Sequence, residues 1–143
     1  MATERDEMKN INVVFTDVGG DIINNVLGEH WLHVLVELEP GLFYEATWPR
    51  VKKGPTYRAK RQVKFPLRVS TLRHEKMVAS AESKLGLRYN FWGYFFPRFY
   101  NKTHGIYCSQ YACQILRAGD FPIPIGAGYS PDKLLKALKV YFT

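Results

Sequence analysis

Short alternating runs of apolar and polar residues dominate the first half of the chain. Residues 10–16, NINVVFT, are short and β-branched, which is typical of a strand. Residues 31–48 hold two apolar runs around Glu39-Pro40-Gly41 and predict a β-hairpin. Residues 62–69 alternate basic with apolar side chains, and Pro66 among them cannot donate to a ladder. We therefore predict a half-exposed strand there, near an edge, and a loop with some extended structure before it.

Helical signals follow in the second half. Ser70 or Thr71 can cap a helix that runs to about residue 85, and Gly86 ends it. A second helix begins at about residue 107 or 108 and stops near residue 119. Ser130-Pro131 opens a last helix as cap and first residue. Strands followed by helices predict an α+β fold, with an antiparallel sheet or small open barrel packed against helices.

The length of 143 residues fits one domain, residues 1–143, with a proper hydrophobic core. Apolar residues make up 46% of the chain, yet no apolar run approaches the roughly 18 residues that a membrane span requires. The opening MATERDEMKN is polar and lacks the apolar stretch of a secretory signal. We expect a soluble protein that is cytoplasmic at synthesis, with residues 1–9 forming a mobile polar N-terminus.

Positive charge is unevenly placed along the sequence. The net charge is +7, and no acidic residue lies between Glu45 and Glu75. This basic segment is a candidate anion-facing surface, and a solvated strand and loop is the alternative interpretation. Its nine cationic residues are Arg50, Lys52, Lys53, Arg58, Lys60, Arg61, Lys64, Arg68 and Arg73.

The two cysteines lie five positions apart on the second predicted helix and point about 140° away from each other, so they cannot easily form a disulfide. No Cys-x-x-Cys or His-x-x-x-His pattern supports a structural zinc site, and we expect no metal or other cofactor. Cys108 stands at the helix start, where the helix dipole favours a thiolate. Cys113 is expected to be a small buried residue.

A partner for Cys108 would come from the predicted sheet. His33 lies inside a predicted strand, where a polar side chain needs a reason, and Glu45 lies 12 residues on across the hairpin. If residues 38–40 form the loop, His33 stands directly opposite Glu45, close enough for a hydrogen bond. A two-residue loop would put them on opposite faces. We expect the helix of Cys108 to cover the face of His33, and His104 is the reserve candidate.

Four segments in this order resemble a known family: GEHWLHVLVEL, GLFYEATW, GLRYNFW and GIYCSQYACQIL. They are similar to the circularly permuted branch of the NlpC-type papain-like hydrolases, especially the YiiX group, in which the catalytic His precedes the Cys. Tyr44-Glu45-Ala46 matches the Glu motif of that group, and Tyr107-Cys108-Ser109 matches the nucleophile motif. The related lecithin:retinol acyltransferase branch has a different nucleophile motif and commonly a His as its third polar residue, where this chain has Glu45, which favours a hydrolase here.

The resemblance implies a cysteine hydrolase with Cys108 as nucleophile, His33 as base and Glu45 as the third polar residue. It suggests a peptidase or amidase acting on bacterial cell-wall peptide. A lipid or protein ester or thioester hydrolase, or an acyltransferase, is the alternative. A non-catalytic polyanion-binding module on the same scaffold is a second alternative. The expected partner is a peptide or acyl-bearing substrate, possibly a polyanion bound through the basic segment, with nucleic acid unfavoured. The predicted substrate-binding residues are Tyr89, Trp92, Tyr107 and Ser109.

Overall fold

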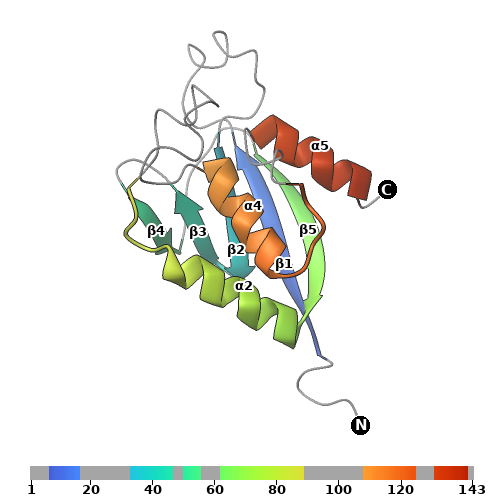
Figure 1. The fold of residues 1–143 in the computed structure, drawn as a ribbon, viewed down its shortest axis with the longest axis horizontal. Coiled ribbons are helices and arrows are strands. Elements are labelled where there is room, and N and C mark those ends of the chain that lie inside the picture. Colours follow the sequence, from blue (N-terminus) through green and yellow to red (C-terminus); the bar gives the residue numbers. More distant parts are fainter. Residues whose placement is uncertain are drawn as a thin grey trace.

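The residues that the structure describes form an open, five-stranded antiparallel sheet and three helices, which confirms the predicted α+β class (Figure 1). The computed structural model describes residues 7–16, 33–46, 50–55, 62–88, 108–124 and 131–141. The sheet has the strand order β4-β3-β2-β1-β5. The described elements are β1 (Met8–Thr16), β2 (His33–Glu39), β3 (Leu42–Ala46), β4 (Val51–Gly54), β5 (Gln62–Ser70), α2 (Thr71–Ser83), α4 (Cys108–Ala118) and α5 (Pro131–Tyr141).

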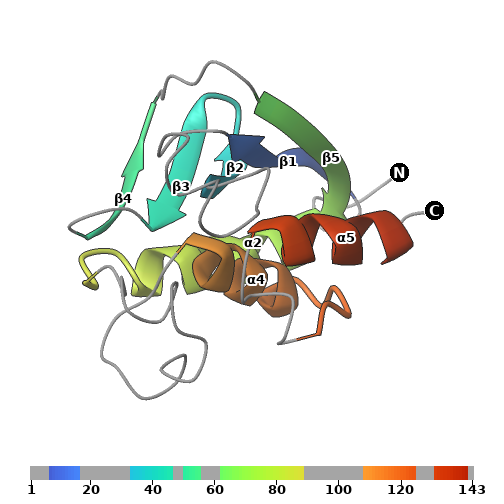
Figure 2. The same ribbon diagram turned by 90° about the horizontal axis from the view of Figure 1, so that it is seen from above.

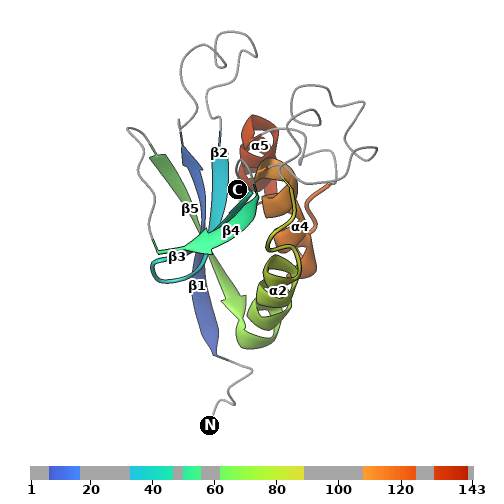
Figure 3. The ribbon, with the colours of Figure 1, turned by 90° about the vertical axis from the view of Figure 1, so that its left-hand side faces the viewer.

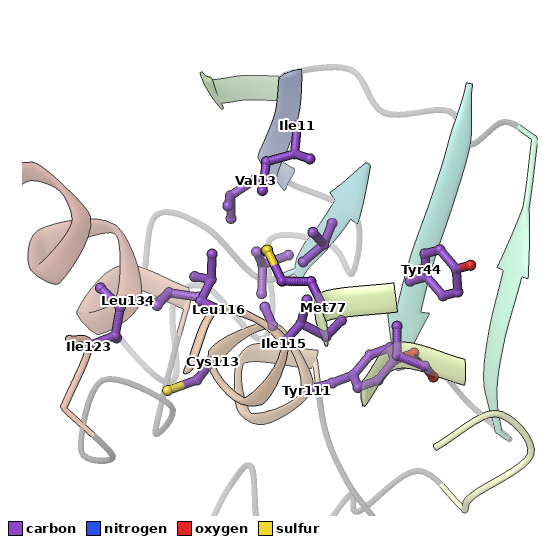
Figure 4. Packing of buried hydrophobic residues seen from close by; sticks show 14 of the residues in the cluster. Ile11, Val13, Tyr44, Met77, Tyr111, Cys113, Ile115, Leu116, Ile123 and Leu134 are labelled. Carbon is purple, nitrogen blue, oxygen red and sulfur yellow. Dashed lines mark hydrogen bonds between the residues drawn. The ribbon is translucent and has the colours of Figure 1, made fainter. Parts of the chain in front are cut away.

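The sheet and the helices form two layers. Seen edge-on, the strands lie on one side and the helices on the other (Figure 3). From above, the sheet curves over α2 and α4, which lie side by side beneath it (Figure 2). The core fills the space between the layers, where apolar side chains from alternate strand positions meet those of the helices (Figure 4). Ile11, Val13, Tyr44, Met77, Tyr111, Ile115 and Leu116 are among its fully buried members.

The strand predictions hold for β1, β5 and the hairpin of β2 and β3, and β5 lies at a sheet edge as Pro66 indicated. One expectation was wrong. Residues 8 and 9 are not part of a mobile N-terminus, because Met8 pairs with Ser70 and Lys9 with Val69. The extended structure expected in the loop before β5 is the strand β4, which pairs with β3. Its bounds had no local signal, because its lysines favour strands poorly without a neighbouring strand to pair with.

The helix predictions hold closely. Ser70 caps α2, and its hydroxyl accepts a hydrogen bond of 3.3 Å from the backbone N–H of Arg73. Gly86 follows α2 with a φ of +87°, a conformation that side chains disfavour. Helix α4 begins at Cys108 and ends one residue before Gly119, and α5 begins at the expected proline.

A β-bulge at the end of β2 sets the register of the β2–β3 hairpin. The turn is Pro40-Gly41, so the loop has two residues, not the predicted three. Val36 pairs with Tyr44 and Glu37 with Phe43, but Glu39 pairs with Leu42, which leaves Leu38 as the extra residue. A two-residue loop alone would place residues 33 and 45 on opposite faces. The inserted residue restores them to the same face.

His74 of α2 binds the bulged residue. Its Nε2 lies 2.6 Å from the carbonyl oxygen of Leu38, so the ring donates to that oxygen, and the side chain is buried. An unpaired residue in a strand leaves polar backbone groups without their ladder partners, and a buried one must be satisfied elsewhere. His74 therefore supplies the hydrogen bond that the bulge removes from the sheet.

Replacing His74 should destabilise the protein through this contact. His74→Leu leaves the buried Leu38 carbonyl without its donor, which should lower the free energy of unfolding by about 1–3 kcal/mol in urea. His74→Gln keeps a donor and should recover part of the loss. Met77→Leu, a volume-conserving change at a buried position of the same helix, is the control and should cost less than about 1.5 kcal/mol. Equal unfolding midpoints for His74→Leu and wild type would contradict this role.

Candidate active site

The start of α4 and the start of β2 lie at the same end of the molecule (Figure 1). Cys108 is the first residue of α4, as predicted, and its fractional exposure is 1%. Tyr111, Ala112, Ile115 and Leu116 follow it on the buried face of the helix, so the thiol stands at the border of the core. The helix dipole is positive at this end and favours an anion there.

His33 and Glu45 contact each other across the hairpin. The Nε2 atom of His33 lies 2.7 Å from Oε2 of Glu45, and both side chains are largely buried, at 13% and 16% exposure. We had expected His33 and Glu45 to be directly opposite each other, and they are not. With Val36 paired to Tyr44, the register continues to a Leu35–Glu45 pair, so His33 lies diagonally from Glu45 on the same face. The diagonal is within reach of two long polar side chains.

The imidazole of His33 also hydrogen-bonds to Cys108. Because Nε2 faces the carboxylate, Nδ1 is the nitrogen left for the thiol. Burial alone would lower the pKa of His33, but hydrogen bonds to Cys108 and Glu45, together with their negative charges, raise the pKa to about 9. At neutral pH the ring is therefore an imidazolium held between a carboxylate and a sulfur.

Glu45 stays ionised in this site. Burial would raise its pKa, but the hydrogen bond and positive charge of His33 lower it, and Lys52 adds to the effect. The Nζ of Lys52 lies 3.7 Å from Oε1 of Glu45, and its side chain is 63% exposed. Each carboxylate oxygen thus faces one cation, His33 on the buried side and Lys52 on the solvent side.

The helix of Cys108 does not cover the face of His33, which corrects our expectation. Alternation along β2 puts Val34 and Val36 on one face and His33 and Leu35 on the other. Val34 and Val36 belong to the core cluster with the side chains of α4, whereas Leu35 is buried outside that cluster. His33 is nevertheless bonded to Cys108. As the first residue of β2, it lies at the strand end near which α4 begins.

Cys113 differs from Cys108 in its surroundings. It is buried, as predicted, and projects from α4 toward the segment that follows the helix (Figure 4). Its sulfur lies 3.7 Å from the carbonyl oxygen of Pro124. Burial raises the pKa of the Cys113 thiol, so the thiol stays protonated at neutral pH. Both cysteines are free thiols.

The predicted substrate-binding residues cannot be placed together. Ser109 lies in the first turn of α4 and is fully buried. Tyr89, Trp92 and Tyr107 lie outside the described residues, as does the reserve candidate His104. Their roles stay predictions.

The described cations of the basic segment lie at two separate edges of the sheet, so a single anion-facing surface stays a prediction. The segment supplies β4 and β5, which are the two opposite edges of the sheet. Five of its cations are exposed, but Lys53 binds Glu82 at 2.6 Å and Lys52 lies near Glu45. The Nε of Arg73 donates to the Gly119 carbonyl at 2.6 Å. Arg58, Lys60 and Arg61 lie outside the described residues. A continuous polyanion-binding strip therefore has no support.

Two residues that contact the hairpin of the site escaped the sequence analysis, Lys52 close to Glu45 and His74 at the far end of β2. Lys52 was treated only as one of nine cations, although strand alternation within VKKG puts it on the face of Glu45. His74 has no local signal, because only the fold shows that its side chain is buried against the hairpin.

Among the described residues, none of the helices has the length and apolar character needed to cross a bilayer. The same part of the chain brings together no three His, Cys, Asp or Glu side chains that would ligate a metal. Comparison with protein-family models, curated proteins and solved structures finds no match to this chain. The function must be inferred from the geometry around Cys108.

The titration of His33 tests this geometry. Its ring resonances should titrate near pH 9 in NMR spectra, and Glu45→Gln should lower that pKa because the carboxylate charge is lost. The folded-state pKa lies above the ordinary value of 6.5, so the pairing stabilises the fold fully below about pH 6.5 and loses its effect as pH rises through about 9. Glu82→Gln, on the other face, is the control. A wild-type His33 pKa near 6.5 would contradict the contacts.

Proposed function

We propose that the protein is a cysteine hydrolase in which Cys108 attacks an acyl carbon. The observation that carries the proposal is the chain of contacts from Glu45 through the His33 imidazolium to Cys108 at a helix N-terminus. A nucleophilic thiol needs its thiolate form, and both an adjacent imidazolium and a helix N-terminus favour it. The carboxylate fixes the orientation and tautomer of the ring, as in catalytic triads.

The reaction proceeds in two acyl transfers. The Cys108 sulfur attacks the carbonyl carbon, and the carbonyl electron pair moves to oxygen at the positive end of α4. As the tetrahedral intermediate collapses, the C–N or C–O bond breaks and His33 gives its proton to the leaving group. Water then attacks the thioester while His33 takes up its proton. Cleavage of the C–S bond regenerates the thiolate and imidazolium, so one water is consumed per bond.

Support for a permuted papain-like arrangement comes from the order of the parts. The His strand β2 and the Glu strand β3 precede the Cys helix α4 in the chain, and α4 packs on the same sheet. This order and the motifs around Glu45 and Cys108 agree with the YiiX group that the sequence resembles. On that resemblance we propose an amide in bacterial cell-wall peptide as the substrate. A lipid or protein ester or thioester would react by the same steps.

Replacing Cys108 should abolish hydrolysis, whereas replacing Cys113 should not. Cys108→Ala should abolish release of p-nitrophenol from p-nitrophenyl octanoate and the cleavage of cell-wall peptide fragments, with the domain still folded. Intact-mass spectrometry should show the octanoyl group on Cys108 in wild type. Cys113→Ala is the matched control, costing on the order of 1 kcal/mol of stability while the chemistry continues. Turnover by Cys108→Ala at the wild-type rate would refute the proposal.

Alkylation measures the reactivity of the Cys108 and Cys113 thiols without any substrate. Iodoacetamide at pH 6–7 should modify Cys108 and spare Cys113, whose raised pKa keeps its thiol protonated. His33→Gln removes the imidazolium and should slow modification of Cys108 by roughly tenfold or more. Peptide mapping identifies the labelled residue, and labelling of Cys113 first would mean that the nucleophile is misassigned.

A further inference from the structure

We propose that Arg50 and Arg88 form a subsite for an anionic group of the substrate, a carboxylate or a phosphate. The inference rests on the proposed function, because it assigns this subsite to the substrate of Cys108. It does not depend on the basic segment as a whole, since Arg88 lies outside that segment. The observation is a pair of arginines at directly opposed backbone positions, at the sheet edge beside the candidate active site.

The chain returns along β4 after α2 and places the two arginines opposite each other. Val51 donates to the carbonyl of Leu87 at 2.8 Å and accepts from the N–H of Gly86 at 2.9 Å. Arg50 and Arg88 are paired by an antiparallel bridge, and both are exposed. Directly opposed side chains have Cβ atoms about 4.5–5.5 Å apart, and like charges in that position destabilise a sheet unless something offsets them.

No carboxylate of the described residues neutralises this pair. The neighbouring cations do have acidic partners, since Lys53 binds Glu82 and Lys52 lies beside Glu45. Arg50 instead donates from Nη1 to the backbone carbonyl of Gly86 at 3.0 Å, which fixes the guanidinium without changing its charge. Two arginines at opposed backbone positions suit an oxyanion, because each guanidinium presents planar, paired donors to carboxylate or phosphate oxygens.

The two arginines lie at the same end of the sheet as His33 and on the same face as Glu45. Glu45 pairs with Lys52 and Ala46 with Val51, so Arg50 lies one step further toward the strand end where His33 begins β2. Alternation puts Arg50 on the face of Lys52 and Glu45, and Arg88 opposite it shares that face. Only β3 separates β4 from β2, so the backbones of Arg50 and His33 lie about 10 Å apart. An anionic group a few bonds from the scissile carbonyl would reach both arginines.

Direct binding tests the subsite apart from catalysis. Inorganic phosphate and acetate are titrated separately into the Cys108→Ala protein, and the Nε–Hε resonances of arginine are followed by NMR. Saturable shifts at Arg50 and Arg88, lost for Arg50 in Arg88→Gln, would support the site, and the stronger of the two anions indicates the group it prefers. Arg68, exposed on the opposite edge strand, is the control. Equal, non-saturating shifts at all three arginines would overturn the proposal.

Matched substrates test its use in the reaction. Mono-p-nitrophenyl suberate and p-nitrophenyl octanoate have the same chain, with and without a terminal carboxylate. The test is the ratio of kcat/KM for the suberate ester to kcat/KM for the octanoate ester. The double variant Arg50→Gln/Arg88→Gln should lower this ratio about tenfold, whereas Arg68→Gln should leave it unchanged. An unchanged ratio in the double variant overturns the substrate role. Binding shifts without hydrolysis of either ester would refute the hydrolase and leave an anion site, so the two failures are distinguishable.

Discussion

One extra residue in β2 determines whether this protein has a candidate site at all. The hairpin turns in two residues, which by parity would place His33 and Glu45 on opposite faces of the sheet. The bulge at Leu38 returns them to one face, and their side chains then meet at 2.7 Å. Because His74 binds the bulged carbonyl, a residue of α2 holds the register at the far end of the strand from His33. Packing of the helix layer and geometry of the site are thus linked through the hairpin.

The charges at the site depend on the same register. Glu45 faces His33 with one oxygen and Lys52 with the other, so its charge is offset on both sides. Isolated burial would neutralise a carboxylate or an imidazolium, and mutual pairing is what keeps both ionised. The imidazolium in turn stands beside Cys108, at the positive end of α4. A shift of β3 by one residue would turn Glu45 to the other face and remove both of its contacts.

Periodicity and capping residues were sufficient to predict most elements, because β1, β5, α2, α4 and the hairpin each have a local signal in the sequence. The bulge has none: Leu38 continues the apolar alternation of β2, and only pairing with β3 shows that it is extra. The contact of His33 with Glu45 was therefore predicted correctly from a wrong loop length. The division of the basic segment between two sheet edges has no local signal either. The strands β4 and β5 follow each other in sequence but lie at opposite edges of the sheet, because the order of the strands depends on the whole chain.

The two ends of α4 differ in their contacts. At its C-terminal end, Arg117 donates to the carbonyl of Ile123 and Arg73 donates to that of Gly119, while Arg73 also lies over the ring of Phe121. A side chain at Gly119 would meet Met77 at 2.6 Å, so the chain turns here in close contact with α2. These contacts fix the C-terminal end of the helix and leave Cys108 at the opposite end. In the proposed hydrolase, a thiol on the first turn of a helix that is anchored elsewhere is oriented toward its imidazole by rigid elements, as a precise reaction geometry requires.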